Sequence, residues 1–151
     1  MHRIWHIPEI NILPLGEIRD ERAATVVATF PVWDVVKERL SLDVEKVLYI
    51  NNATLNAWNE LVNSVEGEVI YAIGGGLAID AAKYLACQTH LPVNCIPTAI
   101  SVDAIMAWSS AIREQGSVRY IETTIPEKLL VDFNLIASAP PAIRAAGICD
   151  V

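Results

Sequence analysis

Short apolar runs alternate with segments of helical periodicity between about residues 20 and 100, and this rhythm limits the possible folds more than any other feature of the chain. The apolar runs are rich in β-branched residues and too short for helices, which is typical of buried strands. We predict four such strands, over 23–30, 46–50, 68–73 and 93–96. Apolar residues recur at helical spacing between them, which predicts helices over about 32–40, 55–65 and 77–89.

Strands that alternate with helices are typical of βαβ units, which build a parallel sheet covered on both faces. The sequence therefore predicts an α/β fold, a Rossmann-like open and mostly parallel sheet with helices on both faces. Beyond Pro97 the rhythm changes: Ser117–Ile125 and Leu129–Val131 could supply strands or a hairpin. The end, 134–151, is rich in Ala and Pro and has no clear strand. No linker divides the chain, so we treat 1–151 as one domain.

Composition excludes several classes of protein. Hydrophobic residues make up 53% and charged residues 19%, which is incompatible with intrinsic disorder. The 11 Lys and Arg against 18 Asp and Glu leave a net charge of −7, so we expect no nucleic-acid partner, because phosphate contacts need a basic face. No apolar stretch approaches the ~20 residues of a membrane span, and we expect no membrane association.

The amino terminus and the cysteines point to the cytoplasm. Polar residues and prolines interrupt residues 8–14, so no signal-peptide core is visible. Three cysteines are widely spaced, without a CxxC pair: Cys87, Cys95 and Cys149. Neither a disulfide framework nor a zinc knuckle is indicated. We therefore expect reduced thiols in a cytoplasmic protein.

Three glycines, Gly74, Gly75 and Gly76, stand between the third predicted strand and the next helix. Glycines at such a turn let the backbone approach a ligand closely, and the helix that follows offers free N–H groups to a phosphate. Asp80 and Lys83 share a face near that helix end, so we expect Lys83 to reach a pyrophosphate and Asp80 to steady the loop or the lysine. The spacing is not GxGxxG, and on the glycines alone a plain tight turn is an equal interpretation.

Three motifs in a fixed order over residues 69–150 carry a family resemblance. They are GGGxxxDxxK from Gly74 to Lys83, PTxxSxD from Pro97 to Asp103, and a series of V-D, A-P and A-G-x-x-D that ends at Asp150. In these motifs the sequence resembles the iron-containing alcohol dehydrogenase and glycerol dehydrogenase superfamily, which shares the dehydroquinate synthase-like fold. Within it, the chain is most similar to the glycerol-1-phosphate dehydrogenase branch. Dehydroquinate synthases usually carry Gly-Phe at positions 82–83, so that branch fits less well.

The resemblance implies NAD or NADP as the cofactor and a small polyol or glycerol phosphate as the substrate. It places the pyrophosphate on the three glycines, and Thr98 and Ser101 along the cofactor between the pyrophosphate and the nicotinamide ribose. The alternative interpretation of Thr98 and Ser101 is a pair of ordinary turn residues after a strand. The choice between NAD and NADP depends on the loop near 29–33, where no charged residue decides it.

The same resemblance gives Asp103 a catalytic place near the substrate hydroxyls and makes Asp150 the first ligand of a divalent metal, zinc or iron among others. Such a metal acts as a Lewis acid on the alcohol oxygen. Asp103 could equally cap the segment 104–112, because aspartate is common at helix starts. We expect Asp132 to be a surface carboxylate at a strand end.

In the family, two further metal ligands are histidines of a helical second domain, and no histidine follows His90 in this sequence. We therefore expect 1–151 to be the amino-terminal NAD(P)-binding domain of a larger dehydrogenase, inactive by itself. Val102 and Trp108 depart from residues frequent in the family, which leaves open a non-catalytic α/β module that serves packing or partner binding. A face meant for a second domain would also favour self-association, so homo-oligomers stay open.

Overall fold

The structure is a computed structural model that describes residues 6–100 and 103–146. At its centre lies a six-stranded sheet in the order β1-β8-β5-β4-β2-β3, and every neighbouring pair is parallel. Its strands are Glu9–Ile12 (β1), Arg19–Ala28 (β2), Ser41–Tyr49 (β3), Val69–Gly74 (β4), Val93–Pro97 (β5) and Lys128–Val131 (β8). The prediction of an open, parallel α/β sheet is confirmed.

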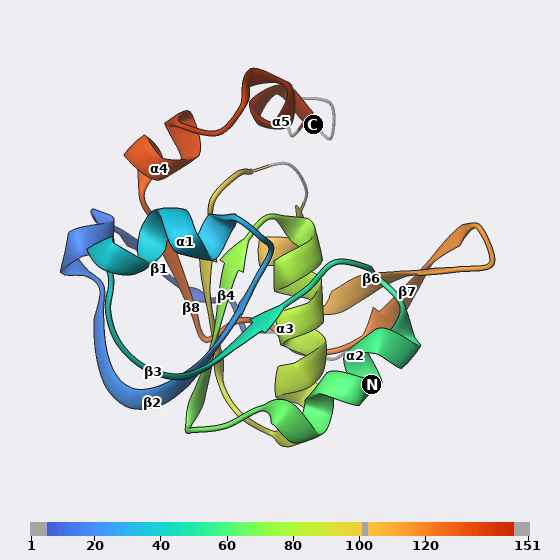
Figure 1. Ribbon diagram of the computed structural model, residues 1–151. Helices are drawn as coiled ribbons and strands as arrows, with labels where there is room; N and C mark the ends of the chain where they lie inside the picture. Colours follow the sequence, from blue (N-terminus) through green and yellow to red (C-terminus); the bar gives the residue numbers. More distant parts are fainter. Residues whose placement is uncertain (1–5, 101–102, 147–151) are drawn as a thin grey trace.

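Helices pack on both faces of this sheet, as Figure 1 shows from the β3 edge. The α-helices are Val32–Val36 (α1), Leu55–Leu61 (α2), Gly76–Thr89 (α3), Phe133–Ala137 (α4) and Pro141–Ala146 (α5). Short 3₁₀ turns are Leu15–Glu17 (η1), Lys37–Arg39 (η2), Val62–Ser64 (η3) and Asp103–Ile105 (η4). α2 and α3 cover one face and α1 the other, while α4 and α5 lie beyond the carboxyl ends of the strands (Figure 1).

Two buried clusters correspond to the two faces. On the α2/α3 face, Trp58 and Leu85 are fully buried against side chains of the central strands such as Ile70. Thr54 caps α2 as its position suggests, since its Oγ1 accepts a hydrogen bond from the backbone N–H of Ala57. On the opposite face, Val36 of α1 packs with a second set of buried residues. The central strands therefore have apolar residues on both sides, which explains their continuous apolar runs.

The carboxyl-terminal third differs most from the sequence-based expectation. Residues Ser109–Glu114 (β6) and Ser117–Glu122 (β7) form a separate antiparallel hairpin. β7 lies within the expected stretch 117–125, whereas β6 was not predicted as a strand, and the expected stretch 129–131 joins the main sheet as β8. The Ala- and Pro-rich end forms α4 and α5. The prediction missed β1, which pairs with β8 at the edge of the sheet.

A polar network occupies the amino ends of the strands. Arg22 and Asp20 form a forked ion pair with Nη2–Oδ2 at 2.8 Å, and the hydroxyl of Tyr71 donates to Asp20 Oδ2 at 2.7 Å. The hydrogen bond from Arg22 lowers the pKa of Asp20 to about 2, against the opposing effect of burial and with help from Tyr71. Each of these polar groups is paired within the protein.

Candidate functional site at the carboxyl ends of the strands

The sheet reverses its order between β2 and β4. The chain passes from β2 to the edge strand β3 on one side, and then returns to place β4 on the other side of β2. The helices that follow β2 and β4, α1 and α3, lie on opposite faces of the sheet (Figure 1). Residues of both helices line the same open space at the carboxyl ends of these two strands. Open α/β sheets bind their ligands at such a reversal point.

The glycine turn lies at this open space. Gly74 ends β4 with a φ of 151°, and a Cβ atom at this position would lie 3.0 Å from the Cβ of Ala78. Gly75 precedes α3, which starts at Gly76 without a side-chain cap among the described residues. The first N–H groups of this 14-residue helix are therefore available to a ligand. Thr98 is half-buried beside the turn, and its backbone N–H donates to the carbonyl of Gly74 at 3.1 Å.

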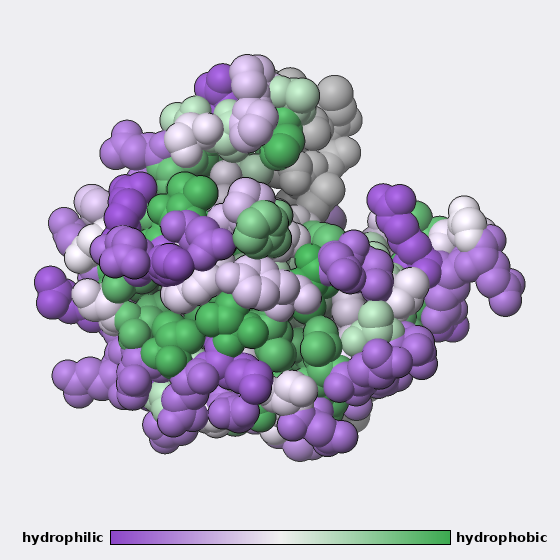
Figure 2. All heavy atoms as spheres, viewed as in Figure 1, coloured by the Kyte–Doolittle hydropathy of each residue, from purple (hydrophilic) through white to green (hydrophobic). Residues whose placement is uncertain are grey.

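A cleft of about 830 Å³ opens from the glycine turn. One wall comes from α1 and the residues before it, and the other from α4, α5 and the loop between them. Its lining is mostly apolar: Thr29, Pro31, Val32, Val35, Val36, Gly75, Gly76, Leu77, Thr98, Ala99, Leu135, Ser138, Ala139, Pro140, Ala142 and Ile143. Apolar atoms are visible where α4 meets α1 in the space-filling view (Figure 2). A flat apolar group would suit this cleft.

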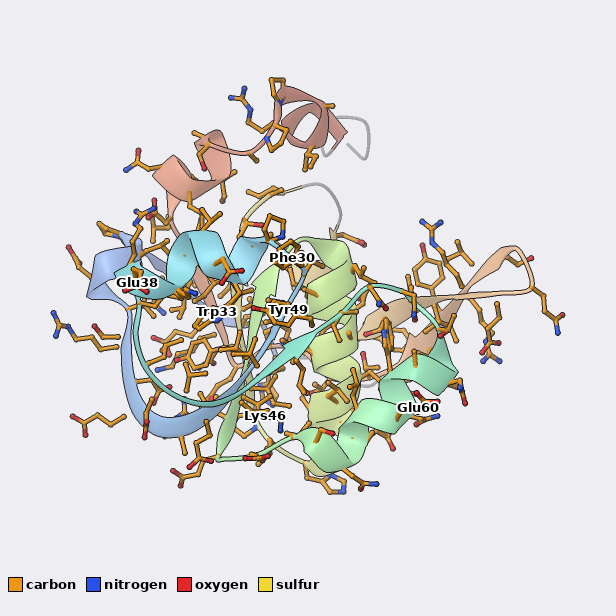
Figure 3. All side chains as sticks on the ribbon, in the orientation of Figure 1. Phe30, Trp33, Glu38, Lys46, Tyr49 and Glu60 are labelled. Carbon is orange, nitrogen blue, oxygen red and sulfur yellow. The ribbon has the colours of Figure 1, made fainter. Side chains whose placement is uncertain are left out.

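Aromatic side chains lie next to the cleft. Phe30, which precedes the cleft residue Pro31, is 75% exposed, and Tyr49 at the end of β3 is 45% exposed. Their rings meet edge to face with centroids 6.2 Å apart, and both are labelled in Figure 3.

Two further hollows adjoin the cleft around the start of α3. The first, of about 610 Å³, shares Gly76 and Leu77 with the cleft and extends to the residues that follow β3, Asn51–Thr54. The second, of about 490 Å³, shares Asp80 with the first and contains Asp103. Neighbouring hollows therefore share lining residues along the first turns of α3, Gly76, Leu77 and Asp80.

Asp80 and Lys83 lie on the face of α3 that packs against the segment from η4 to β6. The Nζ of Lys83 lies 3.2 Å from Asp80 Oδ1, and the side chain of Lys83 is completely buried. The same Nζ donates to three backbone carbonyls, of Ala104 at 2.9 Å, Ala107 at 3.1 Å and Ser109 at 2.6 Å. In this structure the ammonium group of Lys83 points to these carbonyls and lies beside the carboxylate of Asp80.

Burial and pairing oppose each other in this ion pair. Burial raises the pKa of Asp80, and Lys83 with the backbone N–H of Ala111 opposes this shift. Burial lowers the pKa of Lys83, and Asp80 opposes it. Next to them, Ser110 Oγ donates to the carbonyl of Asp80 at 3.0 Å and lies 3.0 Å from Thr123 Oγ1. We refer to Asp80, Lys83, Ser110 and Thr123 as the Lys83 cluster.

The remaining site residues are distributed as follows. Asp103 begins η4 and is exposed, so it does not cap a longer helix over 104–112, where β6 forms instead. Its carbonyl accepts the N–H groups of Met106 and Ala107 at 2.9 and 3.1 Å. Ser101 and Asp150 lie outside the described residues.

Asp132 was expected at the surface, and that expectation is wrong. The residue is 3% exposed, and its carboxylate accepts hydrogen bonds from the N–H groups of Asn134, Leu135 and Leu15 at 2.8, 3.2 and 2.9 Å. Burial alone would raise the pKa of Asp132, but these N–H groups, with Arg39 nearby, lower it below its ordinary value. We refer to this arrangement as the Asp132 cap. An aspartate directly before Phe-Asn-Leu-Ile-Ala is the sequence signal that could have identified it.

The described part of the chain has neither a cluster of metal ligands nor a helix that could span a membrane. Within residues 6–100 and 103–146, no three His, Cys, Asp or Glu side chains gather closely enough to hold a metal ion. Over the same residues, no helix has both the length and the apolar character that crossing a bilayer requires.

Comparison with known proteins gives consistent matches. A family model described as iron-containing alcohol dehydrogenase matches residues 18–140. A glycerol-1-phosphate dehydrogenase of Thermofilum pendens is 30% identical over 83% of this chain and 39% of that protein. An uncharacterized oxidoreductase of Synechocystis is 36% identical over 65% of this chain and 26% of that protein.

Solved structures agree on the fold. A glycerol dehydrogenase from Schizosaccharomyces pombe superimposes with a TM-score of 0.84 at 24% identity, over 99% of this chain and 43% of that one. A sulfoacetaldehyde reductase from Bifidobacterium kashiwanohense, in complex with NAD+, gives 0.76 at 19% identity, over 95% and 49%. The chain thus spans less than half the length of each of these four relatives.

Proposed function

The chain belongs to the iron-containing alcohol dehydrogenase family, and from this premise we propose that it is the nucleotide-binding part of an NAD(P)-linked dehydrogenase that acts on a polyol or a glycerol phosphate. One observation carries the proposal: the glycine turn and the free start of α3 line the apolar cleft, and Gly76 and Leu77 also line the hollow beside it. A dinucleotide has two extended halves joined by a pyrophosphate, so a pyrophosphate at this turn would leave open space for the rest of the cofactor.

The described residues fit a dinucleotide. The pyrophosphate would lie at Gly75 and Gly76, where the N–H groups and dipole of α3 favour negative charge. The absence of a Cβ at Gly74 keeps the turn tight against Ala78. The adenosine half would extend toward the residues after β2 and β3, and the nicotinamide half past Thr98 and Ser101 toward Asp103.

Asp103 is the proposed substrate-binding carboxylate. It is exposed and lines the hollow of about 490 Å³, where its oxygens can accept hydrogen bonds from substrate hydroxyls. The bound nicotinamide would accept the hydride, and the protein's contribution is to hold the alcohol carbon against it. Glycerol-1-phosphate is the substrate suggested by the relatives that carry that name.

The proposal includes a divalent metal, for which this chain would supply one ligand. Asp150, through its place in A-G-x-x-D, is the proposed first ligand, and the others would come from the length of the relatives that this chain does not span. When bound, the metal would polarise the alcohol oxygen. The described residues offer no cluster that fits it, so we derive no step through it.

Calorimetry with the purified chain tests this function. We expect NADH or NADPH to bind, and ADP-ribose to bind as well because it contains the pyrophosphate. Gly76→Glu should weaken both ligands by at least about tenfold, since it places a carboxylate at the helix start where the phosphates would bind. Gly16→Glu is the matched control, because a Cβ there meets nothing closer than the Arg39 carbonyl at 4.0 Å. A folded sample that binds none of the three ligands would overturn the proposal.

A further inference from the structure

The buried ammonium of Lys83 connects two parts of the proposed site. Its own helix, α3, starts at the glycine turn seven residues before it, at Gly76. Its three acceptors belong to the segment that follows Asp103, at 21, 24 and 26 residues along the chain. One side chain therefore fixes the segment next to Asp103 against the helix that would bind the pyrophosphate.

The contacts use the full donor capacity of the lysine. An ammonium group has three N–H bonds and no acceptor, and here three carbonyls lie within 2.6–3.1 Å of Nζ. Asp80 at 3.2 Å balances the charge. Since the side chain is fully buried, no donor remains for a phosphate at the helix start.

The rest of the Lys83 cluster extends the connection to the hairpin. Ser110, in β6, bonds to the backbone of α3 through the carbonyl of Asp80. Thr123, directly after β7, donates its N–H to the carbonyl of Trp108 at 3.0 Å. Tyr120, in β7, lines the same hollow as Asp103. Lys83 therefore contacts the segment that joins the two elements lining this hollow, the turn at Asp103 and the hairpin.

We propose that Lys83 is a positioning residue, which holds the Asp103–Ser109 segment and the hairpin at a fixed distance from the cofactor-binding turn and does not itself bind the cofactor. The inference rests on the proposed function, because Asp103 matters only if this hollow takes the substrate. It replaces the expectation that Lys83 reaches the pyrophosphate.

Nuclear magnetic resonance of the lysine ammonium groups tests the proposal in the unaltered chain. We expect the Lys83 ¹⁵Nζ signal to show protons protected from exchange and couplings across hydrogen bonds to the carbonyl carbons of Ala104, Ala107 and Ser109. Addition of ADP-ribose should leave these couplings in place. Their loss on titration, or a coupling from Nζ to ³¹P, would overturn the proposal.

A variant separates positioning from cofactor binding. In Lys83→Met, hydrogen exchange should accelerate by at least about tenfold at the amides of 104–110 and 121–123, while β2 and β4 keep their protection. The three lost carbonyl contacts lie in the first stretch, and Trp108 and Ser110 connect that stretch to Thr123 in the second. The affinity for ADP-ribose should stay within about twofold of the original chain. Leu85→Ala, also on α3 and fully buried, is the control for general destabilisation and should not single out these stretches.

Energy transfer from Trp108 to bound NADH gives a readout that general loss of stability does not mimic. Trp108 lies in the segment that Lys83 holds. The difference in transfer efficiency between the original chain and Trp108→Phe is the contribution of Trp108, and it depends on the distance from the indole of Trp108 to the nicotinamide. That contribution should change in Lys83→Met and not in Leu85→Ala. An unchanged transfer together with a large loss of ADP-ribose affinity would show that Lys83 serves the phosphate instead.

The two proposals can fail separately. If the original chain binds neither NADH nor ADP-ribose, the proposed function fails, while the ammonium spectrum and the exchange pattern still decide whether Lys83 holds the segment. Should Lys83→Met not fold, the ammonium spectrum of the original chain decides alone.

Discussion

The Lys83 cluster and the Asp132 cap solve the same problem, a buried charge, in two different ways. Asp132 receives backbone N–H groups from two elements, and the pKa of its carboxyl is lowered as a result. Asp80 depends chiefly on a single lysine, and burial raises its pKa despite that pairing. The two carboxyls therefore differ in their donors, three backbone N–H groups against chiefly one lysine, and their pKa values shift in opposite directions.

The two arrangements also differ in what they connect. The Asp132 cap joins α4 to η1 and stabilises the body of the domain on the α1 face. The Lys83 cluster joins α3 to a hairpin outside the main sheet, next to the proposed substrate carboxylate. The Asp132 cap therefore stabilises the fold, whereas the Lys83 cluster both stabilises the fold and fixes the position of groups in the proposed site.

The largest expected effect comes from breaking the ion pair. Lys83→Met should lower the free energy of unfolding by about 3–5 kcal/mol, because it leaves Asp80 buried without its partner and three carbonyls without a donor. Urea unfolding followed by circular dichroism measures this. The double variant Asp80→Asn with Lys83→Met should lose less than the single variant, since the uncompensated charge is gone; an equal or larger loss would contradict this account.

Removal of the Asp132 cap should have the next largest effect. Asp132→Ala should lower the free energy of unfolding by about 2–3 kcal/mol, from the lost helix cap and the buried N–H of Leu15 that loses its acceptor. The matched control is Asp34→Ala, which removes an exposed partner of Lys37 and should leave the urea midpoint almost unchanged. If the two variants behaved alike, the cap would have no special role.

Acid titration separates the lowered carboxyls from the raised one. A carboxyl with a lowered pKa stabilises the fold above its unfolded pKa, near 4, and loses this contribution as the pH falls toward its folded pKa. Asp20, with a pKa of about 2, should therefore lose its contribution between about pH 4 and 2. In Asp20→Asn, the loss of stability from pH 7 to pH 2 should shrink by about 1 kcal/mol, less than the shift alone implies because solvent partly screens the pair.

Asp80 should respond with the opposite sign. Its folded pKa lies above the unfolded value, so its protonation in acid favours the fold, and its ionisation opposes the fold as the pH rises through the folded pKa. Asp80→Asn should therefore make the acid destabilisation of the chain slightly steeper, as measured by urea midpoints from pH 7 to pH 3. A shallower dependence would contradict the raised pKa.

The smallest effect is a difference in thiol chemistry on the α3 face. Cys95 is completely buried near Lys83, and burial raises the pKa of its thiol to about 12. Cys87 on α3 is half-buried. At pH 8, iodoacetamide should modify Cys87 well before Cys95, as followed by peptide mass spectrometry. If Lys83 limits access of the reagent to Cys95, the ratio of the Cys87 and Cys95 modification rates should move toward one in Lys83→Met.

The sequence predicted the parallel sheet well because each central strand is an apolar run of its own. Val69–Gly74 and Val93–Pro97 are buried at every residue. Each can therefore be recognised as a strand from its own sequence, without knowledge of the strands beside it. β1 was missed because Glu-Ile-Asn-Ile has the exposed pattern of an edge strand and follows Pro8. α4 and α5 were missed because they are short and flank the Pro140–Pro141 pair.

The site was predictable where its signal is local. The glycine turn and the helix after it are contiguous in sequence, and the structure has both. The environment of Lys83 was not predictable in this way, because its three acceptors are backbone atoms more than twenty residues away. One hint was available: Asp80 and Lys83 are the charged residues of α3, Gly76–Thr89, whose other residues are mostly apolar, which predicts a buried pair.

The pairing of β1 with β8 has a consequence for how the chain folds. Residues Glu9–Ile12 find their sheet partner at Lys128–Val131, close to the other end of the sequence. During synthesis β1 therefore leaves the ribosome long before its partner β8, whereas β2, β3 and β4 can assemble earlier from neighbouring segments. We expect β1 to dock after these three strands, and the Asp132 cap, which ties Leu15 to the residue after β8, to form at the same stage.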